Sequence, residues 1–238
     1  MKNILILILT FLSINTFAQH METVEKITWY GQAAVKIDND GQLIFIDPYQ
    51  LTSSEKADLI LITHSHGDHL SFPDIEQIAD EKTVFVCPHD CAETLKEEGY
   101  KIIKAVSPGD KVTIDDTEIE AVAMYNVVKT QYHPKENNWT GFIINVGGTR
   151  IYHAGDTERI PEMKNIECDI AMLPLGQTYT MNSVEEAAEA ALDTGVEIAI
   201  PIHYGMYEGT AEDAKRFQEI LEGKVDVFIL NSGKNELK

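Results

Sequence analysis

The stretch "DLILITHSHGDH", residues 58–69, constrains the fold more than any other part of the chain. Its nearly continuous run of Leu and Ile predicts a strand that is buried on both faces, as in the interior of an α/β sheet. Three histidines and one aspartate follow this run directly. Loops beyond the carboxyl ends of such strands commonly carry functional residues, so we expect a functional site at the end of this strand.

The spacing of these four side chains suits metal binding. His64 and His66 lie two residues apart, and in an extended chain such residues point to the same side, so both can reach one ion. Asp68 and His69 follow Gly67, which allows a sharp turn that would direct this second pair towards a neighbouring ion. Neutral imidazoles and carboxylates are the ligands of zinc and similar ions. One loop is therefore predicted to begin two adjacent metal sites.

Two further apolar runs end in residues of the same type. The run "RIYHAGD" ends at Asp156, and the run "EIAIPIH" ends at His203. Because functional loops follow the carboxyl ends of strands in α/β sheets, both residues are candidates for the same site. The three runs share a pattern of elements and do not form a repeat of fixed period.

The rest of the chain interleaves predicted strands with predicted helices. The stretches "ITWYGQAAVKI" and "GQLIFIDPY" are predicted to be two antiparallel strands joined by the turn sequence "DNDG". Apolar stretches between turn sequences predict β-structure over residues 101–151, and "VDVFIL" is predicted to be the last strand. Capping residues and apolar periodicity predict helices at residues 71–80, 91–99, 183–194 and 210–223.

The first residues are typical of an export signal. A lysine at the second position precedes an apolar run, and "TFA" stands before Gln19. This order predicts a signal peptide at residues 1–18, cleaved after Ala18, and hence a periplasmic or extracellular protein. A short membrane anchor is the alternative, but the apolar run is short for a bilayer span. We therefore expect no membrane association after cleavage, and a single domain at residues 19–238.

Charge limits the partners of the chain. Its formal net charge is −20, and the loss of Lys2 with the signal peptide would leave −21. A surface this acidic repels phosphate backbones, so we expect no nucleic-acid partner. It also argues against a basic membrane-binding face.

The three cysteines allow more than one interpretation. Cys87 and Cys91 flank "PHD", and Cys168 lies far from them in the sequence. We interpret Cys87 and Cys91 as buried thiols at a strand end and a helix start. A disulfide between them is the main alternative, and a metal site that includes His89 is another.

The motif "THSHGDH" resembles the signature of the metallo-β-lactamase superfamily. The stretches "YGQAAVKI…IFIDP", "YHAGDT" and "IPIHYG" resemble that superfamily as well, so the resemblance spans nearly the whole predicted domain. Their order and spacing are most similar to the branch that contains ascorbate-phosphate lactonases and N-acyl-phosphatidylethanolamine phospholipase D. The motif is specific for the superfamily and says little about the substrate.

The resemblance implies a complete set of ligands for two metal ions. A carboxylate in "AGDT" would bridge the ions, and the histidine of "IPIHYG" would complete the second site. The matching residues are His64 and His66 for the first ion, Asp68, His69 and His203 for the second, and Asp156 for the bridge.

The third ligand of the first ion is less clearly marked. The family takes a histidine from the region between the first motif and the bridging aspartate. His133 is favoured because it lies in the polar stretch "QYHPKENNW" before a predicted strand, with His153 and then His89 as alternatives. Asp47 and Thr63 are candidates for orienting the ligand histidines.

The resemblance implies a hydrolase that acts on a small-molecule substrate. Two divalent ions would supply hydroxide near neutral pH and polarise the bond under attack, which could be an ester, lactone, amide or phosphodiester bond. Asp68 is the expected catalytic residue, since it could orient the hydroxide and transfer a proton. We expect zinc, with Mn²⁺ or Fe²⁺ as alternatives, because ligand type alone does not define the metal.

Two other functions are compatible with the same motifs. One is an iron-containing or mononuclear relative with redox chemistry, and the other is a non-catalytic metal-binding protein of the same fold. The filled ligand positions favour hydrolysis over both.

The fold that the resemblance implies is an α/β (α+β) structure, a four-layer αββα sandwich. Two mixed β-sheets would pack face to face with helices outside, and the metals would lie at one edge. The predicted order of strands and helices agrees with this arrangement.

Overall fold

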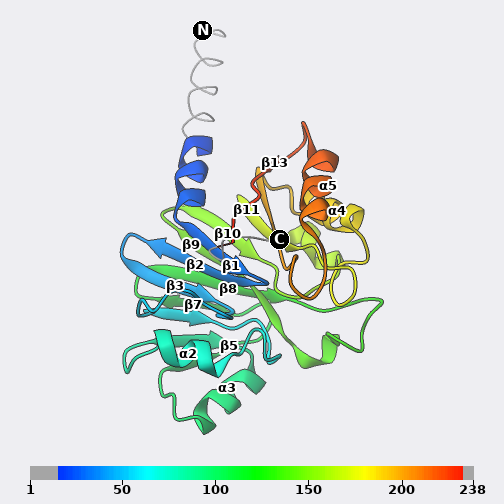
Figure 1. The fold of residues 1–238 in the computed structure, drawn as a ribbon. Helices are drawn as coiled ribbons and strands as arrows, with labels where there is room; N and C mark the ends of the chain where they lie inside the picture. Colours follow the sequence, from blue (N-terminus) through cyan, green and yellow to red (C-terminus); the bar gives the residue numbers. More distant parts are fainter. Residues whose placement is uncertain (1–15, 233–238) are drawn as a thin grey trace.

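Two mixed β-sheets form the centre of the computed structural model, which describes residues 16–232 (Figure 1). The first sheet, called sheet A, has six strands in the order β1 to β6. Its first three strands pair antiparallel, and β3 to β6 pair parallel. The strands are β1 (Ile27–Gly31), β2 (Ala34–Asn39), β3 (Gln42–Ile46), β4 (Leu59–Leu61), β5 (Val84–Cys87) and β6 (Ile103–Ala105).

The second sheet, called sheet B, has seven strands in the order β13-β12-β11-β10-β9-β8-β7. Strands β7 to β10 pair antiparallel, and β10 to β13 pair parallel. The strands are β7 (Lys111–Ile114), β8 (Thr117–Ala123), β9 (Thr140–Val146), β10 (Thr149–His153), β11 (Ile170–Pro174), β12 (Ile198–Ile202) and β13 (Asp226–Val227).

Helices cover the outer faces of the two sheets, with α2 and α3 on one side and α4 and α5 on the other (Figure 1). Alternation along the strands explains these layers. In β3 and β4, Ile44 and Leu59 face the core between the sheets, while Phe45 and Ile60 pack with α2 and α3. The helices are α2 (Phe72–Ile78), α3 (His89–Glu97), α4 (Val184–Thr194) and α5 (Ala211–Leu221), with 3-10 helices η1 (Lys135–Asn137) and η2 (Pro161–Asn165). The predicted sandwich of two mixed sheets and flanking helices is confirmed.

The helix caps agree closely with the sequence. The Ser183 side chain accepts a hydrogen bond from the backbone N–H of Glu186, and α4 ends at Gly195 with a φ of 64°. Thr210 caps α5 in the same way. Ser71 precedes α2, but its hydroxyl donates to the Asp74 carboxylate and does not cap the backbone.

Three local predictions need correction. The stretch "ITWYGQAAVKI" forms two strands, β1 and β2, because the chain turns at Gln32, whose φ is 50°. The last predicted strand shrinks to the two residues of β13. Gly67 does not have a positive φ, and a Cβ added there would meet no atom within 4 Å. The turn after His66 therefore does not require glycine.

The described N-terminal segment is a helix at residues 16–25 that contacts sheet B. Gln19 Nε2 donates to the Gly147 carbonyl at 2.8 Å, and Thr23 donates to the Thr149 hydroxyl at 3.1 Å. The predicted signal peptide lies mostly outside the described residues. Within residues 16–232, no helix has both the length and the apolar character needed to cross a membrane.

The cysteines are free thiols. Cys87, at the end of β5, and Cys91, in α3, are both buried between α3 and the outer face of sheet A. Burial raises the pKa of Cys87 to about 12, so its thiol stays protonated and unreactive at neutral pH. The structure therefore agrees with the interpretation of buried thiols, and it does not contain the alternative disulfide.

Candidate metal centre

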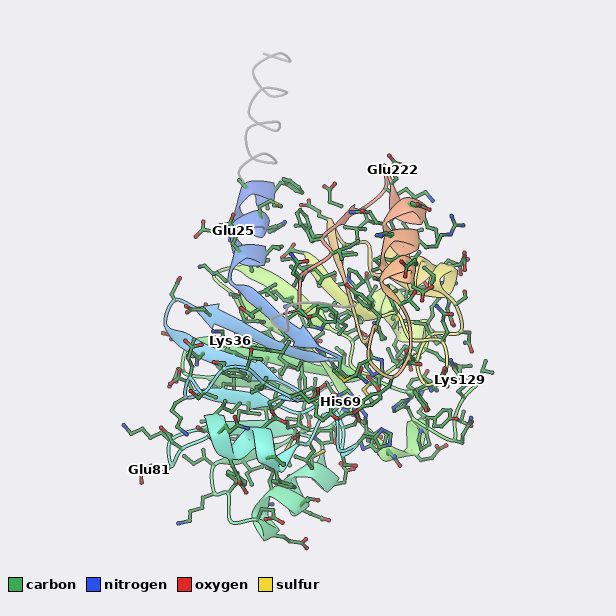
Figure 2. All side chains as sticks on the ribbon, viewed as in Figure 1. Glu25, Lys36, His69, Glu81, Lys129 and Glu222 are labelled. Carbon is green, nitrogen blue, oxygen red and sulfur yellow. The ribbon has the colours of Figure 1, made fainter. Side chains whose placement is uncertain are left out.

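Loops from both sheets meet at one end of the sandwich. The loop after β4 in sheet A carries the "HSHGDH" motif, while sheet B supplies Asp156 after β10, His203 after β12 and His133 before β9. His69 is labelled where these loops meet, near the middle of the view in Figure 2. The structure brings all seven candidate ligands together, although the loops that carry them are far apart in the sequence.

The first group consists of three histidines. The ligand nitrogens of His64, His66 and His133 lie within 4.8 Å of one another. The distance from His64 Nε2 to His66 Nδ1 is 3.0 Å. His64 and His133 are buried, and His66 is half-buried. This is the trio expected for the first ion.

The second group consists of Asp68, His69 and His203, whose ligand atoms also lie within 4.8 Å of one another. His69 Nε2 is 3.7 Å from Asp68 Oδ2. His69 and His203 are buried, whereas Asp68 is half-buried and borders the pocket. This is the trio expected for the second ion.

Asp156 lies between the two groups. Its Oδ2 atom is close to histidines of both, and the carboxylate is almost completely buried. The distances from Oδ2 to the Nε2 atoms are 3.0 Å for His203, 3.3 Å for His69, 3.6 Å for His133 and 4.0 Å for His64. This central position fits a carboxylate that bridges two ions.

Several buried polar atoms in the centre have no hydrogen-bond partner. They include Nε2 of His69, Nε2 of His133 and Oδ1 of Asp156. Leaving such groups unpaired is costly in a protein interior, and nearly all buried polar atoms are satisfied. Divalent ions between the two groups would satisfy these atoms, so the residues fit a metal centre.

Burial keeps part of the centre neutral. It lowers the pKa of His64 well below the usual value and lowers the pKa of His133 to about 4. Both imidazoles are therefore uncharged at neutral pH and offer a lone pair to a metal. His66 shows a lowered pKa for the same reason.

Carboxylates raise the pKa of His69 and so oppose the effect of burial. Burial lowers the pKa of His69, but Asp156 and Asp47 outweigh it and raise that pKa well above its usual value. Burial raises the pKa of Asp156, yet His203 and His69 reverse this and hold it well below the usual range. The carboxylate is therefore ionised, and a bound cation would take the place of the histidine protons.

Asp47 and Thr63 orient two of the ligand histidines. His69 Nδ1 donates to Asp47 Oδ2 at 2.8 Å, while the hydroxyl of Thr63 donates to the same oxygen at 2.6 Å. His64 Nδ1 lies 2.9 Å from the Thr63 hydroxyl and can donate to it. This chain of hydrogen bonds places the protons on Nδ1 and leaves each Nε2 free for a metal.

Glu208 forms an ion-pair contact with His203, and the sequence analysis missed it. Its Oε1 lies 2.9 Å from His203 Nδ1. The carboxylate also accepts hydrogen bonds from the backbone of Thr178 and Tyr179 and from the Thr180 hydroxyl. No sequence motif marks Glu208, because its partners come from a different loop.

The other two candidate histidines do not join the centre. His153 is buried, and its Nε2 donates to the Ala33 carbonyl at 2.9 Å, while its Nδ1 accepts from the Gly155 backbone. It therefore links the two sheets and steadies the loop before Asp156. His89 is exposed at the start of α3. Of the three alternatives for the first ion, His133 is the one that the structure places beside His64 and His66.

Trp139 forms a wall of the first group. Its ring centroid is 4.9 Å from that of His64 and 5.0 Å from that of His66. The indole nitrogen donates to Asp90 Oδ2 at 2.8 Å. Trp139 therefore packs against two imidazoles of the first group.

A pocket of about 450 Å³ opens over the centre. Tyr49 and Tyr207 contact each other through their hydroxyls, and the rings of Tyr132 and Tyr179 meet edge to face at 4.9 Å. These four tyrosines line the pocket together with Gln32 and several ligands, and no described lining residue is a lysine or arginine. The volume suits a small molecule.

Comparisons with known proteins agree with this geometry. The model of the beta-lactamase superfamily domain matches residues 26–203, which include all seven candidate ligands. A metal-dependent hydrolase of Methanopyrus kandleri is 30% identical, and the match covers 88% of this chain and 98% of the relative.

Solved structures show the same fold. A protein of Parabacteroides distasonis, described as a metal-dependent hydrolase, is 35% identical with a TM-score of 0.77 over 86% of this chain and 93% of that chain. A metallo hydrolase of the archaeon Ignicoccus hospitalis is 26% identical with a TM-score of 0.74 over 87% of this chain and 95% of that chain. The chain therefore belongs to the metallo-β-lactamase superfamily and is one of its metal-dependent hydrolases.

Proposed function

We propose that the protein is a binuclear hydrolase, with zinc as the favoured metal. The observation that carries the proposal is the pair of ligand groups on either side of Asp156. His64, His66 and His133 would hold the first ion. Asp68, His69 and His203 would hold the second, and the central carboxylate would contact both.

Two bound cations would supply an activated water and polarise the bond under attack. The chain itself orients the ligands through Asp47, Thr63 and Glu208. Burial of the centre excludes bulk water from the ligand side, while the pocket admits the substrate from the other. These residues fix the geometry before the substrate arrives, which reduces the reorganisation needed during reaction.

Asp68 is the proposed proton-transfer residue. It borders the pocket, and its Oδ2 accepts a hydrogen bond from Gln32 Nε2 at 2.9 Å. It is therefore the acidic side chain of the centre that is best placed to contact both a water molecule and a substrate. Asp156 also reaches the pocket, but it is buried and its Oδ2 lies among histidines.

The pocket favours an uncharged ester, lactone or amide over a phosphodiester. Among residues 16–232, no lysine or arginine lines it, so an anionic group would be attracted mainly by the metals. Lys129, four residues before His133, donates to the carbonyls of Gln177 and Met181. The tyrosines offer rings and hydroxyls, which suit a substrate with apolar and hydrogen-bonding parts.

Metal content tests the proposal directly. The protein would be purified, loaded with zinc, and analysed by elemental mass spectrometry beside a His66→Ala variant and a His89→Ala control. We expect about two ions per chain in the wild type and the control, as two-metal chemistry requires, and fewer in His66→Ala. Iron in the protein as isolated would favour the redox alternative, and absence of metal after loading would contradict the proposal.

A substrate screen completes the test. Neutral lactones and esters, β-lactams and phosphodiesters would be offered to the zinc-loaded protein and to the metal-free protein. We expect hydrolysis only by the loaded protein, with neutral substrates preferred. Loss of turnover in His66→Ala but not in His89→Ala would tie the activity to the metal centre.

We also propose that the protein is exported after cleavage behind Ala18. The order of Lys2, an apolar run and "TFA" before Gln19 supports this proposal. N-terminal sequencing of the protein from the cell envelope fraction and from the medium tests this. A chain that retains residues 1–18 in the cytoplasm would contradict it.

A further inference from the structure

Gln32 lies in the turn between β1 and β2 and reaches the metal centre from there. Its φ is 50°, in the left-handed region that residues other than glycine seldom adopt. The Gln32 carbonyl accepts hydrogen bonds from the indole of Trp29 at 2.9 Å and from the backbone of His203 at 2.8 Å. Such strained positions concentrate at functional sites, where the surroundings hold them in place.

The side chain of Gln32 lies between two ligands of the second group. Its Nε2 is 2.9 Å from Asp68 Oδ2 and 2.7 Å from His203 Nε2. Its Oε1 is buried and has no hydrogen-bond partner, and only 1% of the residue is exposed. A buried amide oxygen without a partner next to metal ligands calls for a specific explanation.

The position of the amide supplies that explanation. Its nitrogen lies beside Asp68 Oδ2 and His203 Nε2, two atoms that would bind the second ion. With a cation between Asp68 and His203, an amide N–H at this place would face a positive charge. Rotation of the amide by half a turn exchanges its nitrogen and oxygen.

We propose that Gln32 is an additional ligand of the second metal ion through its amide oxygen. The proposal rests on the two-metal function proposed above. The second site would then have three oxygen ligands, from Asp68, Asp156 and Gln32, beside two imidazoles. The first site would have three imidazoles and Asp156. Oxygen ligands suit Mn²⁺ better than they suit zinc, so the two sites should differ in metal preference.

The test compares Gln32→Met, Gln32→Glu and a control, Gln77→Met. Methionine keeps the length of the side chain but has no amide oxygen, while glutamate keeps an oxygen ligand. Gln77 is exposed on α2, where its side chain donates to the Pro73 carbonyl. Competition with a chelator would give separate affinities for the first and the second ion, measured with zinc and with Mn²⁺.

We expect Gln32→Met to weaken binding of the second ion about 10- to 100-fold, the range known for residues that tune metal sites. The affinity for the first ion should not change. The loss should be larger for Mn²⁺ than for zinc. Gln32→Glu should bind the second ion at least as tightly as the wild type. Visible spectra of the cobalt-substituted protein should show fewer ligands on the second ion in Gln32→Met only.

The outcomes separate the two proposals. Two ions in the wild type with unchanged second-ion affinity in Gln32→Met would overturn the role of Gln32 and leave the binuclear function standing. A wild type that binds one ion at most would overturn both. If Gln32→Met does not fold, Gln32→Glu decides, because weaker binding of its second ion would contradict ligation by oxygen at this position.

Discussion

The backbone at three residues of the metal centre adopts an uncommon conformation. Asp47, Gln32 and His203 have φ values of 46°, 50° and 58°. Each position of this kind costs about 1–2 kcal/mol for a residue with a Cβ. The cost is offset locally, since His203 and Gln32 are joined by a backbone hydrogen bond and Asp47 holds both Thr63 and His69. These conformations therefore lower the stability of the fold and, in the same step, orient the ligands.

At the same scale, Glu208 should make stability depend on pH. Burial raises its pKa, but the hydrogen bonds from His203 and from the Tyr179 and Thr178 backbone lower it below the usual value. The unfolded chain therefore binds more protons between the folded and unfolded pKa values, so stability falls as the pH drops through this window. Urea unfolding of the metal-free protein at pH 7 and below pH ~4 should show this loss.

The Glu208→Gln variant is the control for that pH dependence. It keeps the shape of the side chain without the ionisable group. We expect it to be less stable than the wild type at pH 7 and to approach the wild type in acid. If the difference in unfolding free energy between the variant and the wild type is the same at both pH values, the role given to the carboxylate is contradicted.

Gly176 provides a second prediction at the residue scale. A Cβ at this position would lie 1.7 Å from Glu208 Oε1, so Gly176→Ala must displace the carboxylate. We expect the second ion to bind about 10- to 100-fold more weakly, because His203 loses its partner. Gly67→Ala is the matched control, since its Cβ meets no atom within 4 Å. Chelator competition would reveal equal affinities in both variants if this account were wrong.

At the scale of elements, the centre depends on strand ends that lie side by side. β4 is parallel to its neighbours in sheet A, and β12 is parallel to β11 in sheet B. Parallel pairing places their carboxyl ends at one edge, where the loops can converge. The helices keep these strands buried, since α4 packs Ala187, Ala188 and Ala191 into the core. Helix ends are therefore sites where stability can be changed without touching the centre.

Ser183 tests this at the start of α4. Its side chain accepts from the Glu186 backbone, so Ser183→Ala should cost about 1 kcal/mol of unfolding free energy. For a chain of this length, that corresponds to a fall in Tm of roughly 2–4 °C. Ser183→Asn should retain most of the stability, because asparagine also caps helices. Thermal unfolding followed by circular dichroism is the measurement, and equal Tm values for both variants would refute the cap.

At the scale of the whole molecule, the metal centre joins the two sheets. Sheet A contributes the motif after β4, and sheet B contributes His133, Asp156 and His203. His153 fastens the same junction through its hydrogen bond to the Ala33 carbonyl, 120 residues away. Bound ions would add further links between the sheets, so the stability of the whole fold should respond to metal.

Removal of metal should therefore lower the Tm of the protein. An ion that binds only the folded chain stabilises it by about 2.7 kcal/mol when its free concentration is 100 times its Kd. Thermal unfolding with zinc and with a chelator would measure the change. His66→Ala should show a smaller response than the wild type, and His89→Ala the same response. A Tm that does not depend on zinc would mean that the centre does not bind it in the folded state.

The sequence alone determined the features that depend on neighbouring residues. The strand before His64, the caps of α4 and α5 and the turn at "DNDG" follow from local patterns, because they need only short-range hydrogen bonds and alternation. The resemblance of "THSHGDH" and three other stretches to known proteins implied the sandwich and most of the ligand set. The local argument for Gly67 was wrong, because the turn there uses an ordinary backbone conformation.

The tertiary structure decided whatever depends on contacts between distant segments. The choice of His133 over His153 required knowing that His153 faces Ala33 across the sheets, while His133 reaches within 3.6 Å of Asp156. Glu208 lies in no motif, and Gln32 lies in "YGQAAVKI", which by itself indicates no role for it. The roles of both residues follow only from the loops that fold against them. A side chain acts on a metal centre through distances of a few ångströms, and packing of the two sheets sets those distances.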